Sequence, residues 1–350
     1  MYNKTSKSMQ KNPVNFSVAN ENLTKKKIFQ LSKNYFSRFK KNKINYSKFV
    51  KNKKILIAGS GPGREIIFFN SLSPSEVYAV DLSPRNVRLG KSIVKKYSLN
   101  SNKNFITRSN IEKLPFKNNF FDHVFSYGVI HHAKNTDKCF VELNRVLKKN
   151  GTMMLFIYGS SGVYFYLIRK FRKIVKSLSI KEIFKFSKEI KSINPMLVYH
   201  FLDDWKAEFL RTYTRSDLVL RASKLGLDVV KVLNRGLKYD GIERKRISQN
   251  EVKLMGEGEL RYIFKKISNN KSLNKNKLPN NDIGSVDKYD SKILNIYEKK
   301  FNILEKKMVK KKKKEKFKFC HDMHKELLKI MRSKSEFDHK KLVSIIEKNI

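Results

Sequence analysis

The fold is decided by the stretch from Lys54 to Phe69, which reads Lys-Ile-Leu-Ile-Ala-Gly-Ser-Gly-Pro-Gly-Arg-Glu-Ile-Ile-Phe-Phe. The apolar run before the glycines is typical of a buried parallel strand. Gly59, Gly61 and Gly63 then predict a tight turn, and the apolar residues after them begin a helix. Such a turn lets the backbone approach a ligand closely and points the free amides of the helix N-terminus at it.

An acidic residue, Asp81, follows the glycine turn about 20 residues further along the chain. The short apolar run of residues 77–80 predicts a second strand, and it ends at Asp81. An acid about 20 residues after a Rossmann turn suits the hydroxyls of a ribose. The dinucleotide fingerprint G-x-G-x-x-G would need a glycine at position 64, where this chain has Arg64, so the turn fits a pyrophosphate less well. The turn and Asp81 together predict a site for a nucleoside cofactor.

Two further stretches follow in order along the chain. Residues 106–132 read Ile-Thr-Arg-Ser-Asn-Ile-Glu-Lys-Leu-Pro-Phe-Lys-Asn-Asn-Phe-Phe-Asp-His-Val-Phe-Ser-Tyr-Gly-Val-Ile-His-His, and residues 142–156 read Glu-Leu-Asn-Arg-Val-Leu-Lys-Lys-Asn-Gly-Thr-Met-Met-Leu-Phe. With the glycine turn and Asp81, these motifs resemble the class I S-adenosylmethionine-dependent methyltransferases, in the small-molecule branch that includes the quinone-biosynthesis C-methyltransferases. The resemblance is strong over residues 53–157 and looser over residues 213–264.

The resemblance implies an α/β fold, a Rossmann-like methyltransferase sheet of seven strands that is mostly parallel with the last strand antiparallel. Alternating strand and helix patterns over residues 51–160 agree with this fold. We also expect an inserted helical lid and a helical C-terminal tail. The expected segments are a basic N-terminal segment with a cover helix (1–50), a methyltransferase domain (51–268) that includes the insertion (159–212), a linker (269–290) and a basic helical tail (291–350).

The resemblance also implies the cofactor, S-adenosyl-L-methionine, and its contacts. Asn110 and Ile111 would contact adenine, although many relatives have aspartate at the position of Asn110. Ile57 stands where relatives often carry an acid, so backbone carbonyls would take over the contact with the methionine ammonium. The predicted cofactor-binding residues are Gly59, Ser60, Gly61, Gly63, Asp81, Leu82, Asn110, Ile111 and Tyr127.

The fourth predicted strand covers residues 122–127, and we expect Ser126, Tyr127 and Gly128 beside the sulfonium; with Val129 they read Ser-Tyr-Gly-Val. Methyltransferases acting on the amino groups of adenine or glutamine carry an Asn/Asp-Pro-Pro-aromatic motif here, so that branch is disfavoured. His131 and His132 follow, and either could act as a general base near neutral pH. We favour a structural or pocket-lining role for them and name both as the candidate catalytic residues.

The insertion offers several interpretations. Residues 164–178 form an amphipathic, basic pattern that fits a lid over the acceptor, an interfacial membrane helix or a plain surface helix, and we favour the lid. His200 and Asp204 would share a helix face, but no third ligand stands nearby, so we predict no metal site and favour ordinary structure over an acceptor-pocket role. Tyr35 and Phe36, in the expected cover helix, could cover the cofactor, although core packing is the preferred explanation.

Composition sets broad limits. The net charge of the 350 residues is +46, and it lies between +11 and +13 in each of the segments 1–50, 51–160, 161–250 and 251–350. A nucleic-acid footprint concentrates charge on one element; here only residues 1–50 are clearly denser in charge than the rest, so the distribution favours solvated lysines. The two cysteines form no metal or disulfide pattern. No stretch approaches about 18 apolar residues, and we expect a soluble, cytoplasmic protein without a transmembrane segment.

The leading hypothesis is methyl transfer by in-line displacement to a small-molecule, sugar or lipid/glycan-precursor acceptor. Because the leaving group is already activated, the protein mainly aligns the reactants in a dry pocket. A nucleic-acid partner stays open but is not favoured. In that alternative the five lysines at 310–314 help an RNA or protein methyltransferase hold its substrate; otherwise the tail is a solvated helical hairpin. A third alternative is a cofactor-binding scaffold without turnover.

Overall fold

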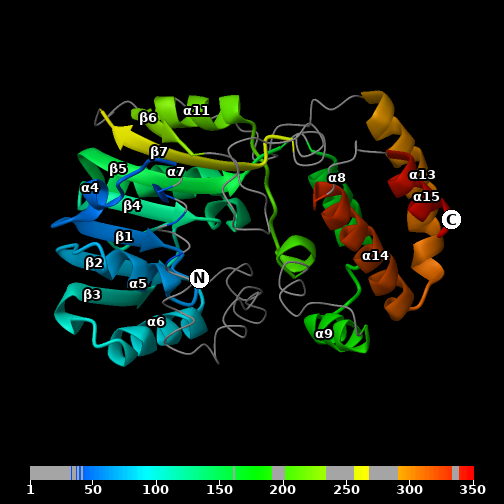
Figure 1. The fold of residues 1–350 in the computed structure, drawn as a ribbon, viewed down its shortest axis with the longest axis horizontal. Coiled ribbons are helices and arrows are strands. Elements are labelled where there is room, and N and C mark those ends of the chain that lie inside the picture. The colour runs from blue at the N-terminus through cyan, green and yellow to red at the C-terminus, as the bar shows by residue number, and fades with distance from the viewer. Residues whose placement is uncertain are drawn as a thin grey trace. The chain divides into compact units, whose positions relative to one another are not determined.

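The computed structural model describes residues 33, 37, 39–40, 42–160, 162–190, 202–233, 256–267, 291–332 and 339–350. The chain divides into two compact units (Figure 1). Unit 1 comprises residues 1–158, 208–245 and 259–284, and unit 2 comprises residues 159–207, 246–258 and 285–350. Tyr35, Phe36, His200 and the predicted linker lie outside the described residues.

Unit 1 contains a seven-stranded sheet with the order β3-β2-β1-β4-β5-β7-β6. Strands β1 to β5 pair in parallel, whereas β7 runs antiparallel to both β5 and β6. The strands are β1 Lys54–Ala58, β2 Glu76–Asp81, β3 Asn104–Arg108, β4 Phe121–Tyr127, β5 Leu147–Tyr158, β6 Leu227–Val232 and β7 Glu259–Lys266. The predicted methyltransferase sheet is confirmed.

Helices cover both faces of this sheet (Figure 1). Successive side chains of β1 alternate between two cores, with Leu56 and Ala58 on one side and Ile55 and Ile57 on the other. The first core includes side chains of α7 and α11, and the second includes side chains of α4, α5 and α6. These helices are α4 Ser47–Val50, α5 Arg64–Asn70, α6 Pro84–Lys96, α7 Thr136–Val146 and α11 Arg215–Lys224.

The sequence predicts one helix that starts after Ser83, with Ser83 as N-cap and Pro84 at the first helical position, and another that Thr214 caps together with Asp217. Ser83 caps α6 by accepting a hydrogen bond from Asn86 N at 3.4 Å, and Pro84 occupies the first helical position. Thr214 caps α11 by accepting from Asp217 N at 3.1 Å. Both capping predictions are confirmed. Short 3₁₀ turns add η1 Ser101–Lys103 and η2 Ile130–His132.

The predicted start of the fifth strand is wrong. The sequence predicted a strand over residues 152–157, but β5 already begins at Leu147, which pairs with Phe121 of β4. The polar residues Lys148, Lys149 and Asn150 give no strand signal in the sequence. The register with β4 shifts between the pairs Phe121–Leu147 and His123–Thr152, and Asn150 in this stretch has a φ of +64°. The preceding helix α7 ends at Val146.

Unit 2 is helical and joins the insertion to the C-terminal tail. Its helices are α8 Val163–Ile174, α9 Ile180–Glu189, α13 Ser291–Lys310, α14 Lys313–Arg332 and α15 His339–Glu347. Helix α8 packs against α13 and α14, and α15 packs against the same two helices (Figure 1). Buried Tyr164 donates a hydrogen bond to Asp204 at 2.5 Å, and its hydroxyl lies 3.1 Å from His324 Nε2. The apolar side chains Leu167, Phe171 and Ile174 of α8 are buried, so α8 offers no apolar face to a membrane; its role as a lid stays a prediction.

Candidate cofactor and acceptor site

The turn after β1 depends on its glycines. Gly59, Gly61 and Gly63 have φ angles of +84°, +50° and +94°, which L side chains rarely adopt. A Cβ on Gly59 would lie 2.5 Å from the methyl carbons of Val129, whereas a Cβ on Gly61 would meet nothing within 4 Å. The turn is therefore closed at Gly59 and open at Gly61, as close approach of a ligand to the backbone requires.

Asp81 ends β2 and is tied to this turn. Its Oδ2 accepts a hydrogen bond from Gly61 N at 2.8 Å, while Oδ1 accepts from Ser83 N at 2.9 Å and Asn86 Nδ2 at 3.1 Å. Burial raises the pKa of Asp81; the charge of Glu65 acts in the same direction and the three hydrogen bonds oppose it. A carboxylate has about four acceptor positions, so about one is left for a ribose hydroxyl. Asp81 thus fastens the turn and can still hold a ligand.

Two buried hydroxyls lie at the same sheet edge. Ser60, in the glycine turn, and Ser126, near the end of β4, are both 0% exposed. In the part of the chain that the structure describes, neither Oγ has a hydrogen-bond partner. A buried polar group without a partner costs free energy, and ligands of open parallel sheets bind outside the carboxyl ends of the strands. These hydroxyls therefore fit a ligand that carries polar groups, as the predicted cofactor does.

The predicted adenine contacts follow β3. Asn110 is exposed, and its Oδ1 accepts a hydrogen bond from Glu112 N at 2.9 Å, which leaves a second lone pair for an amino group. Ile111 is only 9% exposed and packs into the first core. Leu82 is half-buried, and its carbonyl accepts from Arg108 Nε at 3.1 Å. Oδ1 of Asn110 and the apolar side chain of Ile111 thus belong to adjacent residues after β3.

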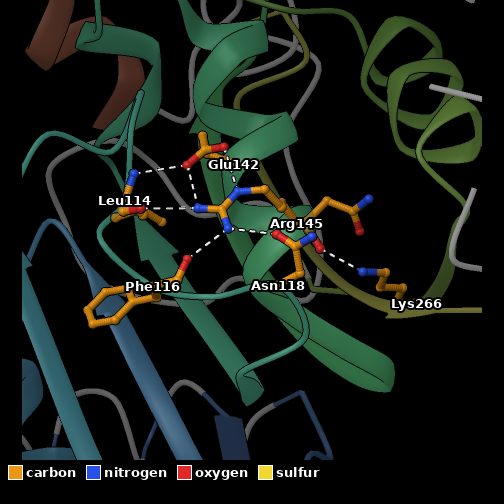
Figure 2. Close-up of polar contacts among 7 residues, drawn as sticks. Leu114, Phe116, Asn118, Glu142, Arg145 and Lys266 are labelled. Carbon is orange, nitrogen blue, oxygen red and sulfur yellow. Dashed lines mark hydrogen bonds and ion pairs between the residues drawn. The ribbon is translucent and has the colours of Figure 1, made fainter. Parts of the chain in front are cut away.

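A side-chain network that the sequence analysis did not assign holds the loop after Ile111. Figure 2 shows Arg145 of α7 pointing into this loop. Its Nη1 donates to Phe116 O at 2.7 Å and Asn118 Oδ1 at 2.8 Å, and its Nη2 donates to Leu114 O at 3.1 Å. Glu142, one turn earlier, binds the same guanidinium at 2.7 and 2.8 Å and accepts from Leu114 N at 2.9 Å. The Glu-Leu-Asn-Arg spacing was the available signal, since i,i+3 ion pairs share a helix face.

The charges in this network are matched. Burial raises the pKa of Glu142, but the hydrogen bonds from Arg145 and Leu114 outweigh it and hold that pKa below its usual value. The same pairing raises the pKa of Arg145. Because guanidinium and carboxylate each bind the loop backbone as well as each other, the network positions the segment between the predicted adenine contacts and β4.

Tyr127 ends β4 in an aromatic cluster. Its ring stacks on Phe125 at 5.6 Å between centroids and lies 4.6 Å from the Phe156 ring. The guanidinium of Arg261 lies 6.0 Å from the centre of the Tyr127 ring. Gly128 follows with a φ of +74°, and a Cβ there would lie 3.2 Å from the Phe156 ring. The end of β4 is therefore packed against aromatic side chains.

The two candidate catalytic histidines have different surroundings. His131 is 0% exposed, and its ring lies 3.9 Å from the Tyr158 ring. His132 is half-buried, and its Nδ1 lies 2.9 Å from the carbonyl oxygen of Phe209. Because a carbonyl only accepts, Nδ1 of His132 carries the proton and the lone pair of the neutral ring is on Nε2. Of the two, His132 has the geometry of a base.

In the part of the chain that the structure describes, no three His, Cys, Asp or Glu side chains are grouped so that they could hold a metal ion. Within the same ranges, each helix is too short or too polar to cross a membrane.

The chain matches known methyltransferases. Residues 56–155 match the family model described as "Methyltransferase domain". A curated protein of Encephalitozoon cuniculi (strain GB-M1), "Putative methyltransferase ECU09_1500", is 39% identical over 59 residues, which are 16% of this chain and 28% of that protein. The chain thus spans little more than a quarter of the length of this relative.

Two solved structures are also similar in fold. A methyltransferase of Bacillus halodurans C-125, described as putative, is 14% identical, with a TM-score of 0.45 and coverage of 66% of this chain and 100% of that one. An S-adenosylmethionine-dependent methyltransferase of Aquifex aeolicus is 16% identical, with a TM-score of 0.40 and coverage of 70% of this chain and 99% of that one.

Proposed function

We propose that residues 56–155, which match the family model described as "Methyltransferase domain", form a class I S-adenosylmethionine-dependent methyltransferase domain, and that the chain methylates a small-molecule, sugar or lipid/glycan-precursor acceptor. One observation carries this proposal. The open glycine turn, the carboxylate of Asp81 with about one acceptor position left, and the unpartnered hydroxyls of Ser60 and Ser126 all belong to one sheet edge.

Each of these residues has a role in holding S-adenosylmethionine. Asp81 accepts one ribose hydroxyl, and the amides of the turn approach the methionine part. Asn110 binds the amino group of adenine through its second lone pair, and Ile111 packs against the ring. Ser126 and Tyr127 line the end of the pocket where the methyl group is transferred. The bound cofactor supplies a methyl group on a positively charged sulfur, which leaves as a neutral thioether.

A base is needed only where the acceptor atom must lose a proton. His132 is suited to this step because the Phe209 carbonyl fixes the ring with its lone pair on Nε2. His131, buried against Tyr158, orients its neighbour by packing. The motif resemblance to quinone-biosynthesis C-methyltransferases makes an aromatic carbon one candidate for the acceptor atom.

The alternative of an RNA or protein substrate held by the lysine run is less well supported. Within the described residues, Lys313 and Lys314 pair with Glu182 and Glu189 of α9 at 2.8 and 2.6 Å, and Lys311 pairs with Glu315 at 3.3 Å. These ion pairs use much of the run's charge inside unit 2. A small or amphiphilic acceptor is therefore the better proposal.

Titration calorimetry with S-adenosylhomocysteine tests the proposal. We expect the wild type to bind and Asp81→Ala to bind roughly tenfold or more weakly, since a hydrogen bond to a charged group contributes about 1.5–3 kcal/mol. Asp228→Ala, at an exposed carboxylate of β6, is the matched control and should bind like the wild type. A folded wild type that does not bind, or an Asp81→Ala variant that binds equally well, would contradict the proposal.

A further inference from the structure

Helix α13 has a buried and an exposed side, both with apolar residues. The buried side faces unit 2 through residues spaced three and four apart, all at most 3% exposed: Tyr297, Phe301, Leu304 and Met308. On the exposed side, Ile296 and Ile303 are 48% and 49% exposed and Val309 is 76% exposed. Packing inside unit 2 accounts for the first set and leaves the second unexplained.

The acidic residues of α13 are turned away from this exposed side. Glu298 pairs with Lys170 of α8 at 2.7 Å and accepts a hydrogen bond from Tyr166. These two contacts hold the pKa of Glu298 below its usual value. Glu305 lies 3.8 Å from both Lys170 and Lys173. Since α13 has no other carboxylate, α8 takes up all the negative charge of the helix.

The charged residues that α13 itself contributes to the exposed side are consequently all lysines. Ile296, Lys299, Ile303, Lys306 and Lys310 follow each other at spacings of three and four residues, so they share one face of the helix. Lys307 has the same spacing, four residues after Ile303 and three before Lys310, and is also exposed. Within the described residues, no carboxylate forms an ion pair with these four lysines. We call the set of Ile296, Ile303, Lys299, Lys306, Lys307 and Lys310 the α13 face.

We propose that the α13 face docks on the surface of an anionic phospholipid bilayer, with the helix lying in the plane of the interface. The two isoleucines are seven residues apart, about 10 Å along the axis, so both can enter the acyl boundary while the helix lies flat. The lysines around them extend their stems and place their ammonium groups at the phosphates.

The chemistry of the face favours lipid over nucleic acid. Phosphates of a nucleic acid would pair with the lysines but would leave both isoleucines in water, and single-stranded nucleic acids are bound through aromatic stacking. The exposed residues of α13 include no aromatic side chain. A lipid surface buries the apolar atoms and pairs the charges at once. The docking proposal does not depend on the proposed function. Only its consequence, access of the protein to an amphiphilic acceptor, rests on that function.

Cosedimentation of the full chain with lipid vesicles tests the proposal. We expect binding to vesicles of phosphatidylcholine that contain phosphatidylglycerol, whose anionic headgroups attract basic segments, and little binding to phosphatidylcholine alone. The double variant Ile296→Gln/Ile303→Gln should lose at least roughly tenfold in partitioning, because it removes two half-exposed side chains from the acyl boundary. The control Val230→Gln changes an equally exposed apolar residue, 48% exposed on β6, and should bind like the wild type.

The charge contribution is tested separately. Lys299→Gln/Lys306→Gln/Lys307→Gln should lower binding to the anionic vesicles by roughly tenfold or more, since each basic residue near the surface contributes about 1 kcal/mol. The control removes three exposed lysines of α6, namely Lys91, Lys95 and Lys96. Emission of the single tryptophan, Trp205, which is 3% exposed in unit 2, reports that each variant is folded.

Three results would overturn the proposal. One is equal binding of the wild type to neutral and anionic vesicles, or binding to neither. Another is a lysine variant that loses vesicle binding while the isoleucine variant keeps it and also binds an oligonucleotide. That result would mean that the α13 face binds polyanions in general. The last is a wild-type dimer that the isoleucine variant dissociates without any effect on vesicle binding, since the face would then contact a second copy.

Discussion

His123 of β4 makes the stability of unit 1 dependent on pH. The residue is 0% exposed; its Nε2 lies 2.7 Å from the Tyr46 hydroxyl and its Nδ1 2.8 Å from the Thr152 hydroxyl. Burial lowers the pKa of His123 from 6.5 to about 3, the charge of Lys53 acts in the same direction, and Thr152 opposes them. The imidazole is therefore neutral in the folded protein at pH 5, where the unfolded chain carries it protonated.

The magnitude follows from the two pKa values. Because the folded pKa lies below the unfolded one, the unfolded chain binds the extra proton, so this contribution is complete above pH 6.5 and is lost as the pH falls towards 3. The loss is about 1.4 kcal/mol per pH unit within that window. Between pH 7 and pH 5, His123 alone should lower the free energy of unfolding by about 2 kcal/mol.

Urea unfolding followed by circular dichroism at pH 7, 6 and 5 measures this contribution. His123→Gln removes the titrating group, so the difference between its stability and that of the wild type should shrink by about 2 kcal/mol from pH 7 to pH 5. Tyr46→Phe keeps the imidazole and removes one hydrogen bond, so it should lower stability by about 1 kcal/mol and keep the wild-type slope. A His123→Gln variant with the same pH slope as the wild type would refute the reasoning.

Two further variants probe the candidate site. Gly59→Ala should lower the melting temperature and abolish most S-adenosylhomocysteine binding in calorimetry. The reason is that the new Cβ would lie 2.5 Å from Val129 and that a φ of +84° is strained for alanine. A variant with wild-type affinity would disprove this. Arg145→Gln should cost about 2 kcal/mol in urea unfolding, since it leaves Glu142 and two loop carbonyls without their donor. Its cofactor affinity should also fall, and unchanged stability together with unchanged affinity would show that the network does not position the loop.

Much of unit 1 could be predicted because its signals are local. The continuous apolar run of β1 and the cap formed by Ser83 before Pro84 depend on a few neighbouring residues, and both appear as expected. The start of β5 could not be predicted in this way. Lys148, Lys149 and Asn150 are polar, and their place in the strand depends on the pairing partner, β4.

Long-range contacts explain what the sequence left open. The insertion and the tail belong to one unit through contacts such as that between Tyr164 and His324, which are 160 residues apart in the chain. Similarly, Arg145 stood in a quoted motif without a role, because its partners Leu114 and Phe116 are about 30 residues away. The different surroundings of His131 and His132 also depend on distant elements and give no sign in the sequence.

Asp81 has a role that the sequence predicts and contacts that only the fold reveals. The sequence assigned it to the ribose, but three of its roughly four acceptor positions bind the chain itself, including Gly61 in the turn. An Asp81 variant therefore loses a ligand contact and a fastening of the turn together. Gly59→Ala strains the same turn and keeps the carboxylate. If Asp81→Ala loses affinity while its melting temperature stays above that of Gly59→Ala, the ribose contact accounts for the loss; if both fall in parallel, the carboxylate acts mainly by shaping the turn.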